Sequence, residues 1–207
     1  MAFLQSHTFA IIASLIALGV EGRYIYSIIR RKTIPNFTGW FIIALSMTFV
    51  FFSGRAWGAG STIWLIGTLA ILHSIEALLA LFYGYFRITF LEKWFIILAL
   101  LSLLVWYIVE DALYTIIINT LIDSFGMVSI AYKLFRFPET EDSIAWWVSV
   151  LMYGIDILAV TDWNIANALF ISVNFIECFI IFILTFRHRK FLQILQLLLS
   201  QYFHIKL

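Results

Sequence analysis

Five carboxylates interrupt the long apolar stretches of this chain, where they could bind protons or ions. They are Glu21, Glu76, Asp123, Asp156 and Glu177. A charge at the centre of a bilayer costs about 2.5–3.5 kcal/mol on insertion scales, so each needs a cation, a proton or water. Arg23 is the one cation within the same stretches. This excess of acids favours groups that bind and release protons or ions, and we predict that role for all five except Asp156.

A second set of residues is suited to holding a polar solute. Asp123 lies about halfway along its apolar stretch, near the middle of a membrane, and Asn119 precedes it by one helical turn. Asn174 lies at a matching depth in the last stretch, with Glu177 one turn further on. We predict that these four side chains line a substrate-binding site. The alternative is that the Asn side chains only bond one helix to another.

Three other side chains have two interpretations each. Arg23 is predicted to be a structural counter-ion to Asp123 or Glu177, with a contact to substrate as the alternative. His73 precedes Glu76 by one turn and could join a proton relay or simply pack. Most tryptophans lie near the ends of the apolar stretches, as in an interfacial belt. Trp40 could instead stack on a ring of the solute.

The composition places the chain in a membrane. Apolar residues make up 63% and charged residues 12% of its 207 residues, whereas soluble domains have about 45–50% and about 25%. The net charge of +1 gives no sign of nucleic-acid binding. One cysteine excludes an internal disulfide, and four scattered histidines predict no set of metal ligands. The chain lacks phosphate loops and nucleophile elbows, so we expect no enzyme and no cofactor.

Seven apolar stretches come close to the length of about 20 residues that a membrane-spanning helix needs. They are 8–29, 37–53, 60–84, 94–110, 112–132, 144–161 and 164–186. The first is too long for a signal peptide, so we expect it to be retained. Eleven of the thirteen Lys and Arg residues fall in three loops (30–36, 85–93 and 133–143) and after residue 186. Because lipid offers no hydrogen-bond partner to the backbone, the stretches are predicted to be helices and the protein all-α. The positive-inside rule predicts that its N-terminus is outside and its C-terminus inside.

The chain is also predicted to contain a duplicated three-helix unit. A shift of 103 residues places Pro35 on Pro138, the two prolines of the protein, and overlays the first three stretches on the last three. Internal repeats of this kind are typical of transporters. The predicted parallel repeats are 1–93 and 111–190, joined by a linker helix at 94–110. An amphipathic cytoplasmic tail is predicted at 191–207, with a simple extension of the seventh helix as the alternative.

The two proline-containing loops are predicted to be hinges on the inner face. Their hinge residues are Pro35 with Asn36 and Pro138 with Glu139. Proline ends a helix because it lacks an N–H donor and restricts the residue before it. Basic residues precede both prolines and would hold these loops inside the cell. We therefore expect the two bundles to flex at these positions.

The 3+1+3 arrangement, with a proline in the basic loops after the first and fifth stretches, resembles the PQ-loop superfamily, which includes the SWEET sugar transporters. More closely, the chain resembles uncharacterised bacterial integral membrane proteins with a Pro-Asn…Thr…Trp loop, an intramembrane Asp and a Pro-Glu-Thr-Glu segment. Here these are Pro35-Asn36, Thr38, Trp40, Asp123 and Pro138-Glu139-Thr140-Glu141. Two departures are Gly39, which separates Thr38 from Trp40, and Ser129, where that family tends to have proline. The resemblance implies a multi-pass protein of the bacterial inner membrane.

We therefore predict a small-solute transporter that works by alternating access between two three-helix bundles, with proton coupling as an option. Its expected partners are a small polar solute, the lipid bilayer and further copies of the chain. Sugar, nucleoside and vitamin remain open as substrates. The alternative is a receptor or assembly protein on the same fold. A weaker alternative is an intramembrane enzyme that uses Glu177 and His73 as acid and base.

Overall fold

The computed structural model describes residues 2–86, 88–109 and 111–204, and this part of the chain is all-α. Its seven helices are α1 (Ala2–Ile29), α2 (Phe37–Trp57), α3 (Ile63–Tyr83), α4 (Phe90–Val109), α5 (Ala112–Arg136), α6 (Ser143–Ile157) and α7 (Ile165–His204), with one 3-10 turn, η1 (Pro138–Thr140). Five of them, α1, α2, α3, α5 and α7, are long and apolar enough to cross a membrane. The predicted all-α, multi-pass architecture is confirmed at this level.

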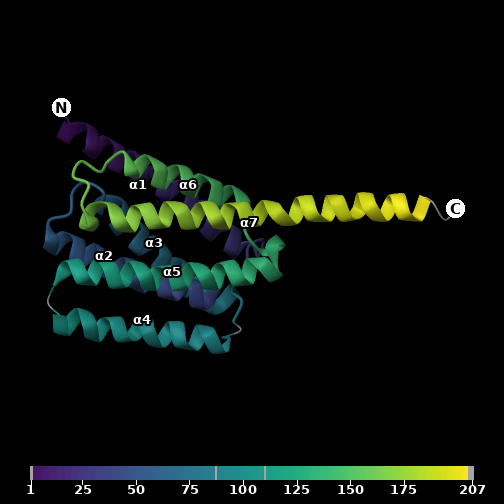
Figure 1. Cartoon of the computed structure of the whole chain (residues 1–207), viewed down its shortest axis with the longest axis horizontal. Helices are drawn as coiled ribbons and strands as arrows, with labels where there is room; N and C mark the ends of the chain where they lie inside the picture. The colour runs from purple at the N-terminus through teal and green to yellow at the C-terminus, as the bar shows by residue number, and fades with distance from the viewer. Residues whose placement is uncertain (1, 87, 110, 205–207) are drawn as a thin grey trace.

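The helices begin and end close to the predicted positions, with three informative differences. α6 ends at Ile157, although its apolar stretch continues to residue 161. α5 continues to Arg136, so Lys133 belongs to a helix and not to a loop. The backbone of α7 continues as one helix to His204 and projects beyond the bundle (Figure 1). The backbone therefore agrees with the alternative in which the tail extends the seventh helix. The amphipathic character predicted for 191–207 depends on side chains that are outside the described part of the structure.

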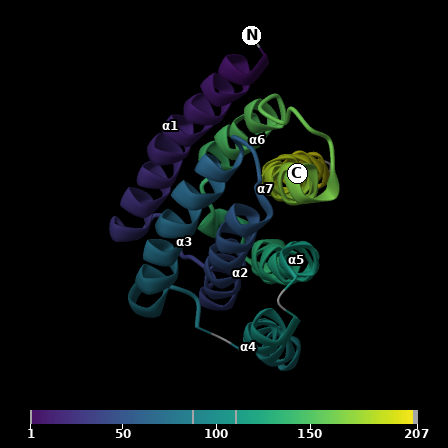
Figure 2. The ribbon, with the colours of Figure 1, turned by 90° about the vertical axis from the view of Figure 1, so that its left-hand side faces the viewer.

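Six helices form a ring in the order α1, α3, α2, α5, α7 and α6, with α4 at one side (Figure 2). α3 packs against both α1 and α2, and α7 packs against both α5 and α6. α2 lies along α5, and α1 lies along α6, which closes the ring. α4 contacts α5 and α2 from outside. The interior of the protein is therefore bounded by these six helices.

Two glycines bring α2 and α5 into close backbone contact. A Cβ on Gly39 would lie 2.6 Å from Cγ1 of Ile130 and 2.9 Å from the carbonyl oxygen of Gly126. A Cβ on Gly126 would lie 2.9 Å from the carbonyl oxygen of Gly39. Small residues at such contacts let membrane helices approach closely. Gly39, the residue that departs from the Thr-Trp spacing of the resembling family, thus has a packing role.

We expect Gly39→Ala to lower the free energy of unfolding by about 1–3 kcal/mol, the usual cost of overpacking. The reaction of a maleimide dye with Cys178 can measure this, because the thiol is buried in the folded protein and is the only one in the chain. Gly19→Ala is the matched control, since a Cβ on Gly19 has nothing within 4 Å. Equal melting temperatures for the two variants would contradict the proposed contact.

Three loops are bonded together at the end of the bundle from which α7 projects. The N–H of Ile34 donates to the carbonyl of Thr140 at 3.0 Å, and the N–H of Tyr85 donates to the carbonyl of Pro35 at 2.7 Å. Asn36 is buried, donates to Oε1 of Glu92 at 3.1 Å and accepts from the N–H of Gly39 at 2.7 Å. The loops after α1, α3 and α5 are therefore connected to one another.

Candidate functional site

A small cavity lies inside the six-helix bundle. Its volume is about 20 Å³, enough for about one water molecule. Its lining comes from all six helices: Glu21, Tyr24, Trp40, Ile43, Met47, His73, Met127, Ala145, Trp146, Ser149, Tyr153, Asn174 and Cys178. The cavity therefore combines ionisable, amide and aromatic side chains from all around the ring of helices.

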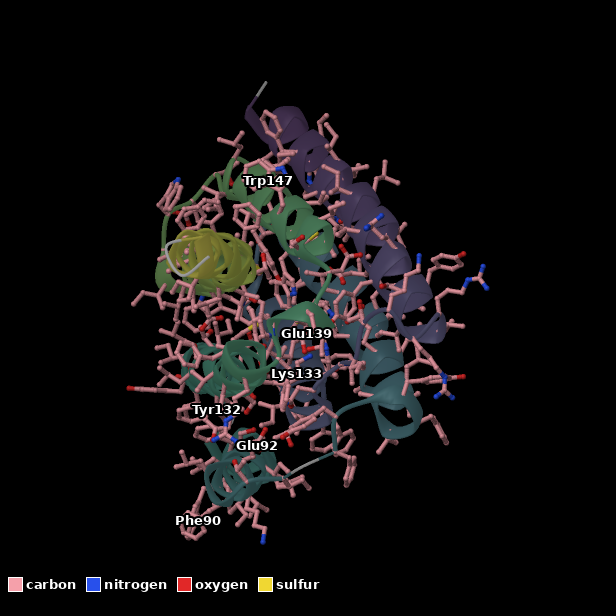
Figure 3. All side chains as sticks on the ribbon, turned by 90° about the vertical axis from the view of Figure 1, so that its right-hand side faces the viewer. Phe90, Glu92, Tyr132, Lys133, Glu139 and Trp147 are labelled. Atoms are coloured by element: carbon pink, nitrogen blue, oxygen red, sulfur yellow. The ribbon has the colours of Figure 1, made fainter. Side chains whose placement is uncertain are left out.

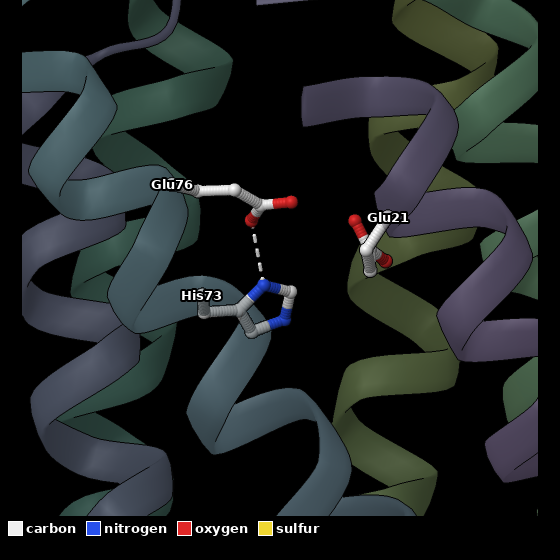
Figure 4. A group of neighbouring side chains, drawn as sticks. All are labelled: Glu21, His73 and Glu76. Atoms are coloured by element: carbon white, nitrogen blue, oxygen red, sulfur yellow. Dashed lines mark hydrogen bonds and ion pairs between the residues drawn. The ribbon is translucent and has the colours of Figure 1, made fainter. Parts of the chain in front are cut away.

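The first of two buried polar clusters beside the cavity joins α1 to α3. Nδ1 of His73 lies 2.8 Å from Oε2 of Glu76, one helical turn further on. Glu21 of α1 faces this pair (Figure 4), and one ligand atom from each of the three side chains lies within 4.8 Å of the others. All three residues are buried. The i, i+3 contact confirms the side-by-side placement of His73 and Glu76.

This cluster bears on the prediction that the histidines form no set of metal ligands. The four histidines are scattered in the sequence, which predicted no set of metal ligands. His73 nevertheless lies with two carboxylates, because α1 and α3 are neighbours in the bundle. A ligand set can be built by two helices that are distant in sequence, so the spacing of histidines alone could not detect it.

The second polar cluster joins α5 to α7 and α2. Oδ1 of Asp123 accepts a hydrogen bond of 2.7 Å from the hydroxyl of Ser46. Asn174 and Glu177 of α7 lie near the same carboxyl group. Oδ2 of Asp123 and Oε2 of Glu177 have no hydrogen-bond partner among the described residues, and the amide nitrogen of Asn174 donates to the carbonyl of Phe170 at 3.1 Å. The structure thus places three of the four residues predicted to bind substrate near one another. Of these three, Asn174 lines the cavity, whereas Asp123 and Glu177 do not. Ser46 completes this cluster, although nothing in the sequence singled it out.

Asn119 faces a different neighbour. Its Oδ1 accepts a hydrogen bond of 3.3 Å from Ser102 of α4, and its Nδ2 donates to the carbonyl of Thr115 at 3.0 Å. The side chain is buried but does not line the cavity. Asn119 therefore connects α5 to α4, which is the helix-bonding role considered as the alternative for the Asn residues.

Two other predicted residues also have positions outside these clusters. Arg23 is a counter-ion, but its partner is Asp142 at the start of α6, with Nε 2.9 Å from Oδ2. The expected partners Asp123 and Glu177 were wrong, because Arg23 faces the rim of the bundle and half of its side chain is exposed. Asp156 is fully buried in α6, and neither carboxylate oxygen has a hydrogen-bond partner among the described residues.

An aromatic group closes the side of the cavity that faces the connected loops. The ring of Trp40 lies 5.2 Å from that of Tyr24, 4.9 Å from that of His73 and 6.2 Å from that of Trp146, measured between centroids. Glu141 accepts hydrogen bonds from the Tyr24 hydroxyl at 2.8 Å and from the Trp146 indole N–H at 3.1 Å. Trp40 thus stacks on side chains of the protein itself.

A buried ion pair lies beneath this aromatic group. Nζ of Lys133 is 2.5 Å from Oε1 of Glu141, and both side chains are almost completely buried. Nζ also donates to the carbonyl of Ile34 in the loop after α1. Seen from the loop end, Lys133 lies inside the bundle, while Glu139 is in the η1 segment at its surface (Figure 3). Of the predicted hinge residues, Pro35 and Asn36 are buried and Glu139 is exposed.

Sequence analysis missed this ion pair. In the sequence, Lys133 is one of the basic residues of a predicted loop, and Glu141 is the last residue of the Pro-Glu-Thr-Glu segment. That segment was the available signal, since it places a carboxylate just before the cap of α6.

Searches of protein-family models, curated proteins and solved structures found no match to this chain.

Proposed function

We propose that the protein is a small-solute transporter of the bacterial inner membrane that works by alternating access between α1–α3 and α5–α7. The observation that carries this proposal is the central cavity, because helices of α1–α3 and helices of α5–α7 both line it with polar side chains. Transporters built from repeats hold substrate near the membrane midplane at the interface between the repeats. In this proposal α4 is the linker, the N-terminus lies outside and the C-terminus inside.

Two observations support an internal duplication. If α5, α6 and α7 repeat α1, α2 and α3, the contact of α2 with α5 and that of α6 with α1 are equivalent, and both are present. The polar clusters also correspond. Asp123 follows Glu21 by 102 residues, and Asn174 and Glu177 follow His73 and Glu76 by 101. In each cluster a carboxylate of a first helix faces an i, i+3 pair of a third helix.

The bonded loops support an assignment of this conformation as closed to the cytoplasm. Ile34 and Thr140 belong to different repeats and are joined by a backbone hydrogen bond. The Lys133–Glu141 pair and the aromatic group lie between these loops and the cavity. A cavity with room for one water does not hold a sugar-sized solute, so the solute would enter after the helix groups separate.

In this proposal the two polar clusters have different roles. Asp123, Asn174 and Glu177 bind the polar groups of a solute or carry the coupling proton. Asn119 holds α5 against the linker helix. Glu21 and Glu76 serve ion coupling from the first cluster. The side chain of Asn174 lines the cavity and offers both donors and an acceptor, which suits hydroxyl- or amide-bearing molecules.

Reconstitution into proteoliposomes tests this function directly. Uptake of a panel of tritiated sugars, nucleosides and vitamins is measured with and without an imposed proton gradient, against empty liposomes. We expect saturable uptake of one solute class. Binding without uptake for every member of the panel would refute transport and favour the receptor alternative.

A disulfide across the loops is expected to abolish uptake. Backbone-bonded residues have Cα atoms about 5 Å apart, which suits a disulfide. The pair Ile34→Cys and Thr140→Cys is made in a Cys178→Ala background, so that no other thiol reacts. Oxidation should hold the inner end closed, and a reductant should restore uptake.

Each single cysteine variant, treated with the same oxidant, is the control for this measurement. Unchanged uptake by the fully cross-linked double variant would show that the two loops do not separate during transport. That result would refute alternating access at this end of the molecule.

A further inference from the structure

We propose that Glu21, His73 and Glu76 bind one divalent transition-metal cation of the Zn²⁺ or Mn²⁺ type. Imidazole and carboxylate together are ligands that such ions take in proteins. The inference concerns binding alone and does not depend on transport.

The donor atoms lie near the spacing that a shared ion requires. Two ligand atoms bound to one ion at about 2.1 Å are separated by about 3.0–3.4 Å, depending on the coordination geometry. Nδ1 of His73 and Oε2 of Glu76 are 2.8 Å apart, and the set with Glu21 spans no more than 4.8 Å. Small side-chain rotations on α1 and α3 would bring all three donors to a common centre.

An unpartnered atom points into the same space. Oε1 of Glu76 is buried and has no hydrogen-bond partner among the described residues, and this carboxylate faces Glu21 (Figure 4). An oxygen left in this way is costly unless it meets a cation or a proton. A metal ion would satisfy it.

The charge of the cluster suits a divalent ion. Two ionised carboxylates and a neutral imidazole carry a charge of −2, which one divalent cation cancels. Neutralisation matters here, because a net charge inside a membrane is expensive. Both Glu21 and His73 line the cavity, so a water molecule there could complete a tetrahedral shell of four ligands.

The corresponding cluster in the other half of the protein provides a comparison within the same chain. Asn174 stands there in the place of His73, and an amide is a poorer ligand for transition metals than an imidazole. Oδ1 of Asp123 has a hydroxyl partner in Ser46, whereas its Oδ2, like Oε1 of Glu76, has no hydrogen-bond partner among the described residues. The imidazole therefore distinguishes the first cluster from the second. The variant His73→Asn gives the first cluster two carboxylates and one amide, the same side-chain types as in the second.

The test is metal binding by the purified full-length protein in detergent, prepared with an affinity tag that contains no histidine. Co²⁺ is added as a spectroscopic probe, and bound Zn²⁺ and Mn²⁺ are counted after dialysis by elemental analysis. We expect one ion per chain and visible Co²⁺ absorption bands. His73→Asn, Glu21→Gln and Glu76→Gln should each weaken binding by at least about 100-fold, which exceeds the usual effect of residues that only support a ligand.

Two controls separate this site from other donors. Asp156→Asn removes another buried intramembrane carboxylate and should leave binding unchanged. Combined replacement of His7, His188 and His204 by Asn should do the same. Loss of binding in either control, or full binding in His73→Asn, would overturn the assignment.

Stability measurements guard against misfolded variants. Zn²⁺ should raise the melting temperature of the natural sequence and of Asp156→Asn, but not that of His73→Asn, while all three elute as one monodisperse species. A folded natural protein that binds no Zn²⁺, Mn²⁺ or Co²⁺ refutes the site whatever the transport assay shows. Metal binding without solute uptake would refute the transporter and leave the site standing.

Discussion

Lys133→Met is expected to lower the free energy of unfolding by about 3–5 kcal/mol, the usual cost of breaking a buried ion pair by removing one partner. For a chain of this size, 1 kcal/mol corresponds to about 2–4 °C, so the apparent melting temperature should fall by about 6–20 °C. The reaction of the Cys178 thiol with a maleimide dye during heating measures this change.

The reason for this large effect is the isolation of Glu141 once the lysine is gone. Both side chains are almost completely buried, so no water replaces the ammonium group. Nζ also holds the carbonyl of Ile34, and that contact between the loops is lost as well. Tyr24 and Trp146 still donate to the carboxylate, but neutral donors do not cancel its charge.

Two further variants show whether the buried charge is the cause. Lys133→Met combined with Glu141→Gln leaves no unpaired charge and should recover a large part of the lost stability. Arg23→Gln breaks the half-exposed pair with Asp142 and should cost less than about 1 kcal/mol. If Lys133→Met and Arg23→Gln have the same melting temperature, the buried ion pair contributes no more to stability than the half-exposed one.

Asp123→Asn should reduce solute uptake in proteoliposomes by about 10- to 150-fold. A hydrogen bond to a charged group contributes about 1.5–3 kcal/mol, and each 1.4 kcal/mol is about tenfold in affinity. The variant should remain folded, because the amide oxygen can still accept the hydrogen bond from Ser46. Uptake, proton coupling and the rise in melting temperature on adding solute are measured together.

Asp156→Asn is the matched control for this experiment. It makes the same chemical change at another fully buried carboxylate, which lies in α6, outside both polar clusters. Its uptake should stay close to that of the natural sequence. If Asp123→Asn leaves uptake, coupling and solute-induced stabilisation unchanged, the assignment of Asp123 to the site is wrong.

The sequence predicted the helices well because a spanning helix leaves a simple mark, an apolar run of about 20 residues. It also placed His73 beside Glu76, since an i, i+3 spacing determines a shared face within one helix. It could not identify the partner across a helix interface. Arg23 was expected to face Asp123 or Glu177 and instead pairs with Asp142, because spacing alone does not say which helix lies opposite.

Lys133 and Asn119 illustrate the same limit. A lysine near the end of an apolar stretch predicts a residue that holds a loop inside the cell, yet Lys133 turns inward to Glu141. Asn119 shares a helix face with Asp123 in sequence, but its oxygen meets Ser102 of α4. Both outcomes depend on how α4, α5 and the loops pack, and one sequence contains no direct record of that packing.

The length of α7 has a mechanical consequence. A helix of 40 residues is about 60 Å long, roughly twice the thickness of the hydrocarbon core of a bilayer. Its first half carries Asn174 and Glu177 beside the cavity, and its second half projects from the bundle (Figure 1). The half of α7 inside the bundle contacts the second polar cluster, so a movement there would be carried to the projecting half. A tilt of about 10° would displace the far end, about 30 Å away, by about 5 Å.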